Sequence, residues 1–333
     1  MADAVLSVSF AGPLVSIQDG GRTGHMRYGV SASGPMDRLS FDAANAALGN
    51  PQGHAGIEVS LGGVILKCES GPVSLAIAGG AFLVDYNGIS CGSWTIITLR
   101  KGDRLTIRAG ASGSWAYIAM SGGLQVDPWL NSKATHTISG FGGGALRAGQ
   151  KLVLHDAVVR EDREGEIAKP NLHATSALSV VMGPQDARFT NAAVRQFTNA
   201  TFKVTDAYDR MGMRLSGPGL ALHSALSIPS EPIVRGSVQV SGDGVPTILL
   251  ADHQTTGGYP KIATVVSVEL DRLVQMRSGE MLRFRSVTAE DAIAQTRQYA
   301  AQKSAYLSKV AIPRGTFAQR LMRENLVHGF LPD

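Results

Sequence analysis

The residues best suited to chemistry gather in one segment, residues 230–261. Its polar side chains include Glu231, Asp252, His253, Tyr259 and Lys261. Asp252 and His253 directly follow an apolar run that is typical of a strand, and a pair of glycines comes soon after them. Loops that a rigid strand positions frequently carry functional side chains. From its type alone, His253 is a general base, a donor to a substrate or a surface imidazole, and these three alternatives stay open.

Two glycine-containing segments near the N-terminus are candidates for anion binding. The first, residues 20–24, holds Arg22, whose planar guanidinium grips a carboxylate or phosphate with two hydrogen bonds. In the second, Ser33 lies just before Asp37, which is expected to cap a helix. The N-terminus of that helix, together with the Ser33 hydroxyl, is also suited to hold an anion. Turn formation alone explains most such glycine runs, including the one at 142–144.

Several other chemistries are excluded by the sequence. Residues 88–92 match the Gly-x-Ser-x-Gly pattern of a nucleophile elbow, but a strand and not a helix is expected after them, so Ser90 is assigned to a hairpin turn. The 8 histidines and 2 cysteines show no metal-ligand spacing, and no Gly-Lys-Ser/Thr of a P-loop occurs. The 31 basic residues are scattered without interleaved aromatics, so nucleic acid is not expected as a partner.

Composition indicates a soluble, β-rich protein. The 333 residues are 44% hydrophobic and 17% charged, with a net charge of +4, which is typical of globular proteins. The 39 glycines lack a collagen-like period and indicate many tight turns between strands. Two cysteines form no disulfide framework, and no signal peptide or membrane span is recognised. We expect a cytoplasmic protein that does not bind membranes.

Short apolar runs between turn residues predict most of the strands. They cover residues 73–77, 95–99, 104–108, 116–120, 178–182, 248–251, 262–268 and 281–284. Four stretches with apolar residues at helical spacing predict the helices. They are a helix between Asp37 and Gly49, and helices over residues 189–197, 289–310 and 317–327.

The predicted domain boundary lies within residues 159–175, a stretch that is rich in charge and poor in apolar residues. It predicts an N-terminal domain over residues 1–165, a C-terminal domain over 166–290 and a helical tail over 291–333. The two halves of the chain show a similar pattern of short strands, which suggests a pair of barrels. The tail is expected either to cover a barrel end or to mediate oligomerisation.

Several separated motifs resemble those of one protein family. They are residues 18–24, 29–37, 44–45, 49–50, 209–215, 230–232 and 252–261. In this order they resemble the allophanate hydrolase subunit 2 family, also called the biotin-dependent carboxyltransferase, KipA-like or 5-oxoprolinase C-subunit family. The resemblance covers residues 5–290 and implies a mainly β fold of two tandem cyclophilin-like β-barrel domains. The sequence adds a few short helices and the helical C-terminal tail.

The resemblance also implies partners and cofactors. Members of the family assemble with a subunit 1 (KipI-like) protein, and in bacteria they contribute to ATP-dependent 5-oxoprolinase with a further subunit. Fused relatives form the carboxyltransferase part of biotin-dependent urea carboxylase. ATP is therefore expected to act through the complex, with no metal beyond the Mg²⁺ that accompanies it. Biotin is expected only under the carboxyltransferase alternative, on a separate carrier, because the chain has no Met-Lys-Met site.

Two departures from the family pattern bear on the substrate and on activity itself. Where the family shows Gly-Ser-Arg-Ser-Thr, residues 131–135 read Asn-Ser-Lys-Ala-Thr, so Lys133 replaces the arginine and Ala134 lacks a hydroxyl. The arginine that usually precedes Ala-Leu is missing near residues 142–146.

The leading hypothesis is the C subunit of a 5-oxoprolinase-type complex, which activates and hydrolyses a small cyclic amide at the expense of ATP. In it, Asp252 and His253 handle protons, while Tyr259 and Lys261 donate to developing negative charge. Substrate-binding roles are assigned to Arg22, Ser33, Ser132, Lys133, Arg214 and Glu231. Two alternatives remain: a carboxyltransferase that moves CO₂ from carboxybiotin to urea or a related amide, and a non-catalytic, KipA-like regulatory binding protein.

Overall fold

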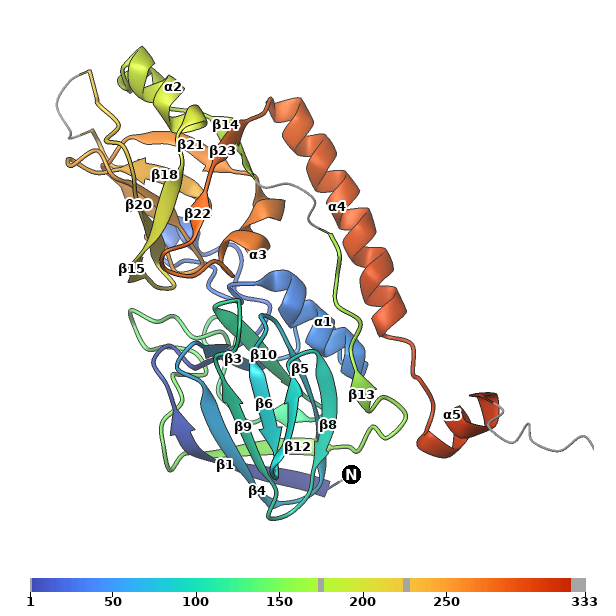
Figure 1. The fold of residues 1–333 in the computed structure, drawn as a ribbon. Coiled ribbons are helices and arrows are strands. Elements are labelled where there is room, and N and C mark those ends of the chain that lie inside the picture. The colour runs from blue at the N-terminus through green and yellow to red at the C-terminus, as the bar shows by residue number, and fades with distance from the viewer. Residues whose placement is uncertain (1, 173–176, 224–227, 325–333) are drawn as a thin grey trace, which may run out of the picture.

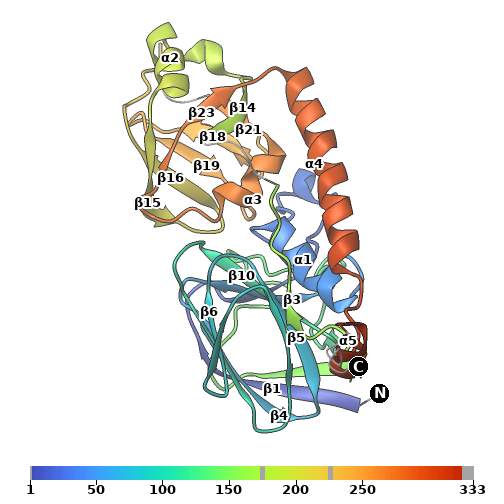
Figure 2. The ribbon, with the colours of Figure 1, turned by 45° about the vertical axis from the view of Figure 1, so that its right-hand side comes forward.

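The computed structural model describes residues 2–172, 177–223 and 228–324, which form two β-rich lobes (Figure 1). The N-terminal half of the chain forms one lobe and the C-terminal half forms the other. A long helix then runs from the second lobe back to the first along one side of the molecule (Figure 2). The mainly β fold with few helices is confirmed, whereas the cyclophilin-like character of the lobes stays a prediction.

The N-terminal lobe consists of two antiparallel sheets. Across the first lie β11 (Gly123–Leu124), β12 (Lys151–Ala157), β1 (Ala2–Ala11), β4 (Val64–Ser70), β9 (Arg104–Arg108), β6 (Leu83–Tyr86) and β7 (Ile89–Gly92). Across the second lie β13 (Gly165–Glu166), β8 (Thr95–Leu99), β5 (Val73–Ala78), β10 (Trp115–Met120), β3 (Gly56–Ser60) and β2 (Ser16–Gln18). Because a strand directs every second side chain to the same face, Leu6 and Val8 of the first sheet share a buried core with Ile57 and Val59 of the second.

The C-terminal lobe is built on one sheet that nearly closes into a barrel. Across it lie β22 (Met281–Leu282), β15 (Phe202–Tyr208), β16 (Gly212–Ser216), β19 (Pro246–Leu249), β18 (Ser237–Val240), β21 (Lys261–Val265), β14 (Leu178–Met182) and β23 (Phe284–Ser286). Its two edge strands, β22 and β23, are separated in the chain by Arg283 alone, so the two edges of the sheet lie close together. A separate ribbon pairs β17 (Glu231–Pro232) with β20 (Thr256–Gly257).

Capping residues begin three of the helices. The Asp37 carboxylate accepts a hydrogen bond from the Ser40 amide at 2.9 Å and begins α1 (Arg38–Leu48), and Gly49 ends this helix with a φ of 76°. Thr190 caps α2 (Asn191–Asn199), and Thr288 caps α4 (Ala289–Val310). All three helices were predicted, although α2 begins and ends two residues later than expected.

The remaining helices are short. α3 (Leu270–Leu273) follows a 3-10 turn, Ser267–Glu269, that takes the place of the end of the strand predicted over 262–268. α5 (Phe317–Glu324) is the described part of the last predicted helix, and residues 325–327 of that prediction lie outside the described residues. None of the helices in the described part of the chain is long and apolar enough to cross a membrane.

Two more predicted strands differ in the structure, and the predicted hairpin is present. β19 ends at Leu249, so the predicted strand over 248–251 is displaced toward the N-terminus. The strand predicted over 281–284 is divided into β22 and β23. The hairpin is confirmed, since β6 and β7 pair through a turn at Asn87 and Gly88. Ser90 lies in strand β7 and not in the turn to which it was assigned, and it does not form a nucleophile elbow.

Hydrogen bonds across a polar interface join the two lobes. Gln275, which follows α3, donates to the Asp37 carboxylate at 2.7 Å and accepts from the amides of Ser114 at 2.9 Å and Trp115 at 3.1 Å. Arg277 donates to carbonyl oxygens of the N-terminal lobe, those of Gly110 and Gly113, at 2.9 Å each. The angle between the lobes is therefore fixed by directional bonds as well as by apolar packing.

Helix α4 ties the lobes together a second time. The Tyr299 hydroxyl donates to Asp271 at 3.0 Å, and Lys303 forms an ion pair with Asp42 of α1 at 2.7 Å. The predicted linker also packs here, because Arg163 is buried and donates to the carbonyl of Ala311 at 2.7 Å. The start of the tail thus covers the side of both lobes.

Candidate functional site

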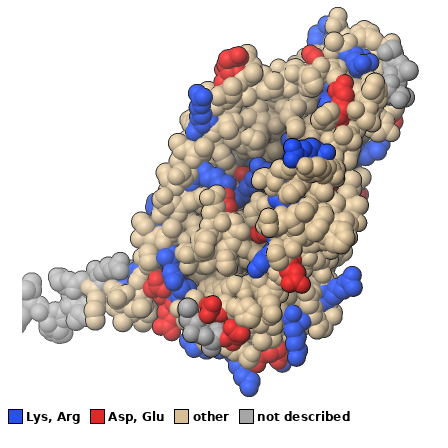
Figure 3. Space-filling model, turned by 180° about the vertical axis from the view of Figure 1, so that it is seen from behind, with Lys and Arg blue, Asp and Glu red and all other residues tan. Residues whose placement is uncertain are grey.

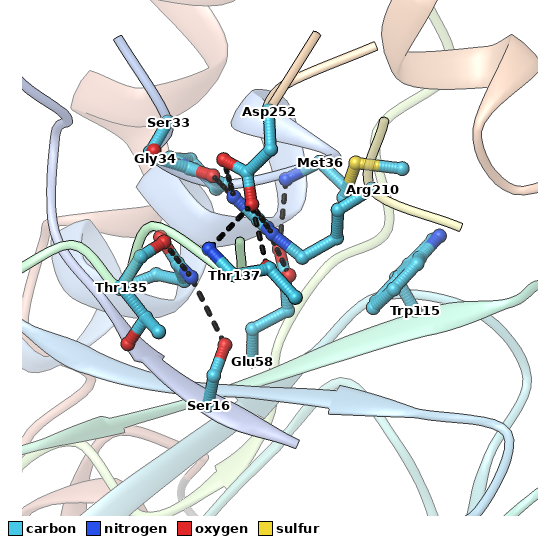
Figure 4. Close-up of polar contacts among 12 residues, drawn as sticks. Ser16, Ser33, Gly34, Met36, Glu58, Trp115, Thr135, Thr137, Arg210 and Asp252 are labelled. Atoms are coloured by element: carbon cyan, nitrogen blue, oxygen red, sulfur yellow. Dashed lines mark hydrogen bonds and ion pairs between the residues drawn. The ribbon is translucent and has the colours of Figure 1, made fainter. Parts of the chain in front are cut away.

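A buried ion-pair cluster lies where the two lobes meet (Figure 4). Arg210, in the turn between β15 and β16, is 1% exposed and binds both carboxylate oxygens of Asp252, through Nε at 2.9 Å and Nη2 at 3.1 Å. Its Nη1 donates to Glu58 of β3, and its Nη2 also donates to the Gly34 carbonyl at 2.8 Å. One guanidinium of the C-terminal lobe therefore binds a carboxylate from each lobe.

The second carboxylate oxygen of Glu58 anchors neighbouring elements. It accepts hydrogen bonds from the Met36 amide at 2.7 Å and from the Tyr117 hydroxyl at 2.9 Å. Tyr117 lies directly opposite Glu58 on the neighbouring strand β10. Burial, and then the charges of Glu58 and Asp37, raise the pKa of Tyr117 well above its usual value, so this hydroxyl stays protonated as a donor.

Asp252 is held as an ionised carboxylate. It also accepts hydrogen bonds from the amide and hydroxyl of Thr137, at 3.2 and 2.6 Å. Burial acts to raise the pKa of Asp252, but the charge and hydrogen bonds of Arg210 outweigh it and bring the pKa to about 2. Such a carboxylate is a weak base near neutral pH, so this geometry does not favour the expected proton-handling role of Asp252. It suits a positioning role.

The contacts of His253 are compatible with a role as a general base. The ring is 4% exposed, and its Nδ1 lies 2.6 Å from the carbonyl oxygen of Gln254. A carbonyl only accepts, so Nδ1 carries the proton and Nε2 carries the lone pair of the neutral ring. Burial lowers the pKa of His253, which favours this neutral form.

Lys261 and Glu231 lie together, as the sequence suggested for residues of one segment. The Lys261 ammonium is 3.5 Å from Glu231 and donates to the Pro232 carbonyl at 3.0 Å, while the Lys261 amide donates to Gln185 at 2.8 Å. Gln185 in turn donates to Glu231 at 2.6 Å. The Lys261 side chain is buried and its acidic partner is half-exposed, so its charge is only partly offset. Tyr259, two residues away, is 49% exposed.

Arg22 binds the loop over residues 129–134 of its own lobe. Its guanidinium donates to the Ser33 hydroxyl at 3.0 Å and to the Ala134 carbonyl, and it lies 4.7 Å from the ring centre of Trp129. Burial lowers the pKa of Arg22, and its Nε has no hydrogen-bond partner among the described residues. Both Arg22 and Ser33 are buried. Arg22 holds residues 129–134 in place, whereas the Ser33 side chain also hydrogen-bonds to Asp252 and helps to lower the pKa of that carboxyl.

Ser132 and Lys133 are also used internally. The Asp19 carboxylate accepts from the Ser132 hydroxyl at 2.6 Å and from the Lys133 amide at 2.5 Å. The Lys133 ammonium is directed to the carbonyl of Leu124 at 2.7 Å. Substrate binding by these two side chains therefore stays a prediction, and the contacts present hold their loop to the rest of the N-terminal lobe.

Two groups that were expected to bind an anion contact protein partners, and their anion-binding roles stay predictions. Arg214 is exposed on β16, where it pairs with Asp243, and among the described residues no hydrogen bond or ion pair joins it to Arg210 or Lys261. The N-terminus of α1 is already occupied by protein carboxylates, since Asp37 caps it and the Arg38 amide donates to Asp271 at 2.9 Å.

A cavity of about 470 Å³ opens beside Arg210. Its lining residues come from both lobes and from the glycine-rich loop: Leu14, Ser16, Thr135, Thr137, Gly140, Gly143, Gly144, Ala145, Arg147, Gln150 and Arg210. On the face opposite to that of Figure 1, charged side chains of both signs gather around a hollow in the middle of the molecule (Figure 3). No group of three metal-binding side chains occurs among the residues that the structure describes.

Sequence reasoning missed Arg210, Glu58 and Thr137. Arg210 stands in a motif that was recognised, but nothing local distinguishes it from Arg214 four residues later. Glu58 carried a usable signal, because it is the one acid in a five-residue strand that is buried throughout. An acid in such a strand requires a buried partner.

Comparisons with known proteins agree on one family. A family model described as "Carboxyltransferase domain, subdomain A and B" matches residues 28–286. The chain is 32% identical to the C subunit of 5-oxoprolinase from Haemophilus influenzae over 83% of this chain and 89% of that protein. It is 30% identical to the C subunit of 5-oxoprolinase from Escherichia coli over 87% of this chain and 93% of that protein.

Solved structures extend the similarity to longer proteins. The chain is 25% identical to the Kluyveromyces lactis urea amidolyase, with a TM-score of 0.81, and the match covers 91% of this chain but 20% of that one. A second solved chain matches with a TM-score of 0.76 and 30% identity, and this chain spans about half of it, 56%. In both solved structures the same fold is therefore one part of a longer chain.

Proposed function

This chain belongs to the carboxyltransferase domain, subdomain A and B, family, and from that membership we propose that it is the C subunit of an ATP-dependent 5-oxoprolinase-type complex. The observation that carries the proposal is its similarity to two proteins named as C subunits of 5-oxoprolinase over 89% and 93% of their lengths. Such a name implies other subunits. We assign to this chain a subunit 1 (KipI-like) partner and a further subunit, which complete the site and bring ATP to it.

In this proposal the chain activates and opens a small cyclic amide with fixed charges and one base. ATP supplies the driving force for opening the ring. His253 accepts at Nε2 a proton from the water that attacks the amide carbon, because its Nδ1 is committed to the Gln254 carbonyl. This proton passes to the amide nitrogen as the C–N bond breaks. Lys261, with its partly offset charge, stabilises negative charge that develops on the amide oxygen. Asp252 and Arg210 hold the backbone on which His253 is placed.

The test is 5-oxoproline-dependent ATP hydrolysis by the chain purified in complex with its partner subunits. We expect turnover only when all subunits are present, and a loss of at least about 10-fold for His253→Gln, since general base catalysis contributes about 10²–10⁴. His155→Gln, at an exposed histidine paired with Asp3, is the matched control and keeps full turnover. An assembled complex that hydrolyses no ATP with 5-oxoproline contradicts the proposal.

A second candidate is a carboxyltransferase acting on urea or a related amide. The observation that favours it is the TM-score of 0.81 to the urea amidolyase over 91% of this chain. Here Lys261 would contact the transferred carboxyl group, and biotin would be carried by another protein. Carboxybiotin-dependent carboxylation of urea, in place of 5-oxoproline-dependent ATP hydrolysis, would select this candidate. Ligand binding without either reaction would select a regulatory binding protein.

A further inference from the structure

The cavity beside Arg210 has the lining of an anion site. It is lined by two arginines, two threonines, a serine and a glutamine, and by no aspartate or glutamate among the described residues. Its volume of about 470 Å³ is within the range of small-molecule sites, about 300–1,000 Å³. None of the residues to which a role was assigned from the sequence lines it. The cavity is therefore a candidate site separate from His253 and Lys261.

Hydrogen-bond donors remain uncommitted at three places on its wall. Ser16 is 3% exposed and its hydroxyl oxygen accepts from Gln18 at 2.9 Å, which leaves its own proton to donate. The oxygen of the Gln150 amide accepts from the Arg147 backbone at 3.1 Å, which leaves the NH₂ group. The Arg147 guanidinium is exposed at the rim and takes part in no ion pair among the described residues.

The floor of the cavity supplies a further donor. The buried Arg210 makes four of its five possible hydrogen bonds, to Glu58, to Gly34 and twice to Asp252. One N–H of Nη1 is left. The positive charge of Arg210 is already offset by the two carboxylates, so its free N–H serves only as a hydrogen-bond donor. The positive charge that remains available to a ligand is that of Arg147.

The shape of the cavity favours a compact ligand. One wall is bare backbone at Gly140, Gly143 and Gly144, and a side chain at Gly143 would meet Ile17 at 2.6 Å. Leu14 and Ala145 add apolar surface. A small uncharged ring can therefore lie directly against the backbone of this wall, while the carboxylate of the same ligand is directed toward Arg147.

We propose that this cavity binds a small carboxylate with a compact neutral body. The carboxylate lies against Arg147, Ser16 and Gln150, and the body packs on the glycine wall with its far end at Arg210 and Thr137. Because Thr137 also bonds to Asp252, the ligand contacts the same network that places His253. The choice of probe rests on the proposed function, since 5-oxoproline is both a cyclic amide and a small carboxylate.

The experiment is isothermal titration calorimetry of the full chain, without other subunits, with 5-oxoproline and with 2-pyrrolidone, the same ring without the carboxylate. We expect 5-oxoproline to bind at least about 10-fold more tightly, as one charge-assisted contact of about 1.4 kcal/mol implies. Arg147→Gln and Ser16→Ala should each weaken binding of 5-oxoproline by about the same factor. Arg108→Gln, at an exposed arginine of the same lobe, should leave it unchanged.

Three results would overturn the site: no binding of 5-oxoproline, equal binding of 2-pyrrolidone, or full affinity in Arg147→Gln. Circular dichroism of each variant separates loss of the site from loss of the fold. Failure of the site and failure of the proposed function can be told apart. If 5-oxoproline binds to the chain but the complex does not turn it over, the carboxylate site stands and the 5-oxoprolinase function is rejected. If the complex turns over 5-oxoproline but Arg147→Gln binds it with full affinity, the function stands and the site is rejected.

Discussion

Replacing Arg210 with methionine tests the buried ion-pair cluster most directly. Methionine keeps much of the volume of the side chain and removes its charge and donors. Glu58 and Asp252, both 0% exposed, would then face each other's charge without the guanidinium. Removing one partner of a buried ion pair costs about 3–5 kcal/mol, and two carboxylates are left here, so we expect a loss of about 5 kcal/mol at pH 7.5. Urea denaturation monitored by tryptophan fluorescence measures it.

The pH dependence of the loss identifies its cause. In the parent chain, Asp252 has a pKa of about 2 and stabilises the fold above pH 4, by about 2 kcal/mol, an amount that disappears as the pH falls toward 2. In Arg210→Met the two buried carboxylates have raised pKa values, so the folded state takes up protons as the pH falls. The difference between parent and variant should therefore be smaller at pH 5 than at pH 7.5.

Arg214→Met is the matched control for this variant. Arg214 lies four residues away and also pairs with an aspartate, but both partners are exposed. Such surface pairs contribute about 0–1 kcal/mol, so the control should unfold close to the parent. Equal losses in the two variants, or a loss in Arg210→Met that grows at pH 5, would refute the account of the cluster.

Two further predictions concern Asp37 and Lys261. Burial, and then the charge of Asp271, raise the pKa of Asp37 to about 6, so the free energy of unfolding should fall by up to about 3 kcal/mol as the pH rises from 4 to 6. Asp37→Asn should flatten that slope in denaturation curves at pH 4.5, 5.5 and 6.5, and an unchanged slope would contradict the assignment. Lys261→Met should lower kcat/KM for 5-oxoproline in the assembled complex by about 10-fold or more, because one contact to developing charge is lost. Lys67→Met, at an exposed lysine, should leave kcat/KM unchanged, and equal values for both variants would remove Lys261 from the mechanism.

Local features of the sequence were sufficient for most elements of the fold. The cap at Asp37 and the stop at Gly49 define α1 within a dozen residues, and short apolar runs define β5, β8 and β9. The closure of the second sheet was beyond such reasoning. It depends on β22 and β23 lying on opposite edges although one residue separates them, which is a property of the whole sheet.

The site was predictable only where its residues are adjacent in sequence. Lys261 and Glu231 were grouped correctly because β17 and β20 bring their segment back on itself. The partner of Glu58 is Arg210, 152 positions away, and no spacing rule connects them. Asp252 was selected as a base from its type and neighbours, but its chemistry depends on that distant arginine, which lowers its pKa and holds the carboxylate in place.

The same cluster limits how the molecule can move. Separating the lobes would break the bond of Arg210 to Glu58, those of Thr137 to Asp252, and the bonds of Gln275 and Arg277 to the N-terminal lobe. Breaking all of these contacts together costs several kcal/mol, because each hydrogen bond contributes about 0.5–1.5 kcal/mol and one to a charged group about 1.5–3 kcal/mol. This is more than the about 1–3 kcal/mol of a typical coupling between sites. We therefore expect the two lobes to move together as one rigid body. Any change of shape on ligand binding is expected in loops such as residues 129–145 and not between the lobes.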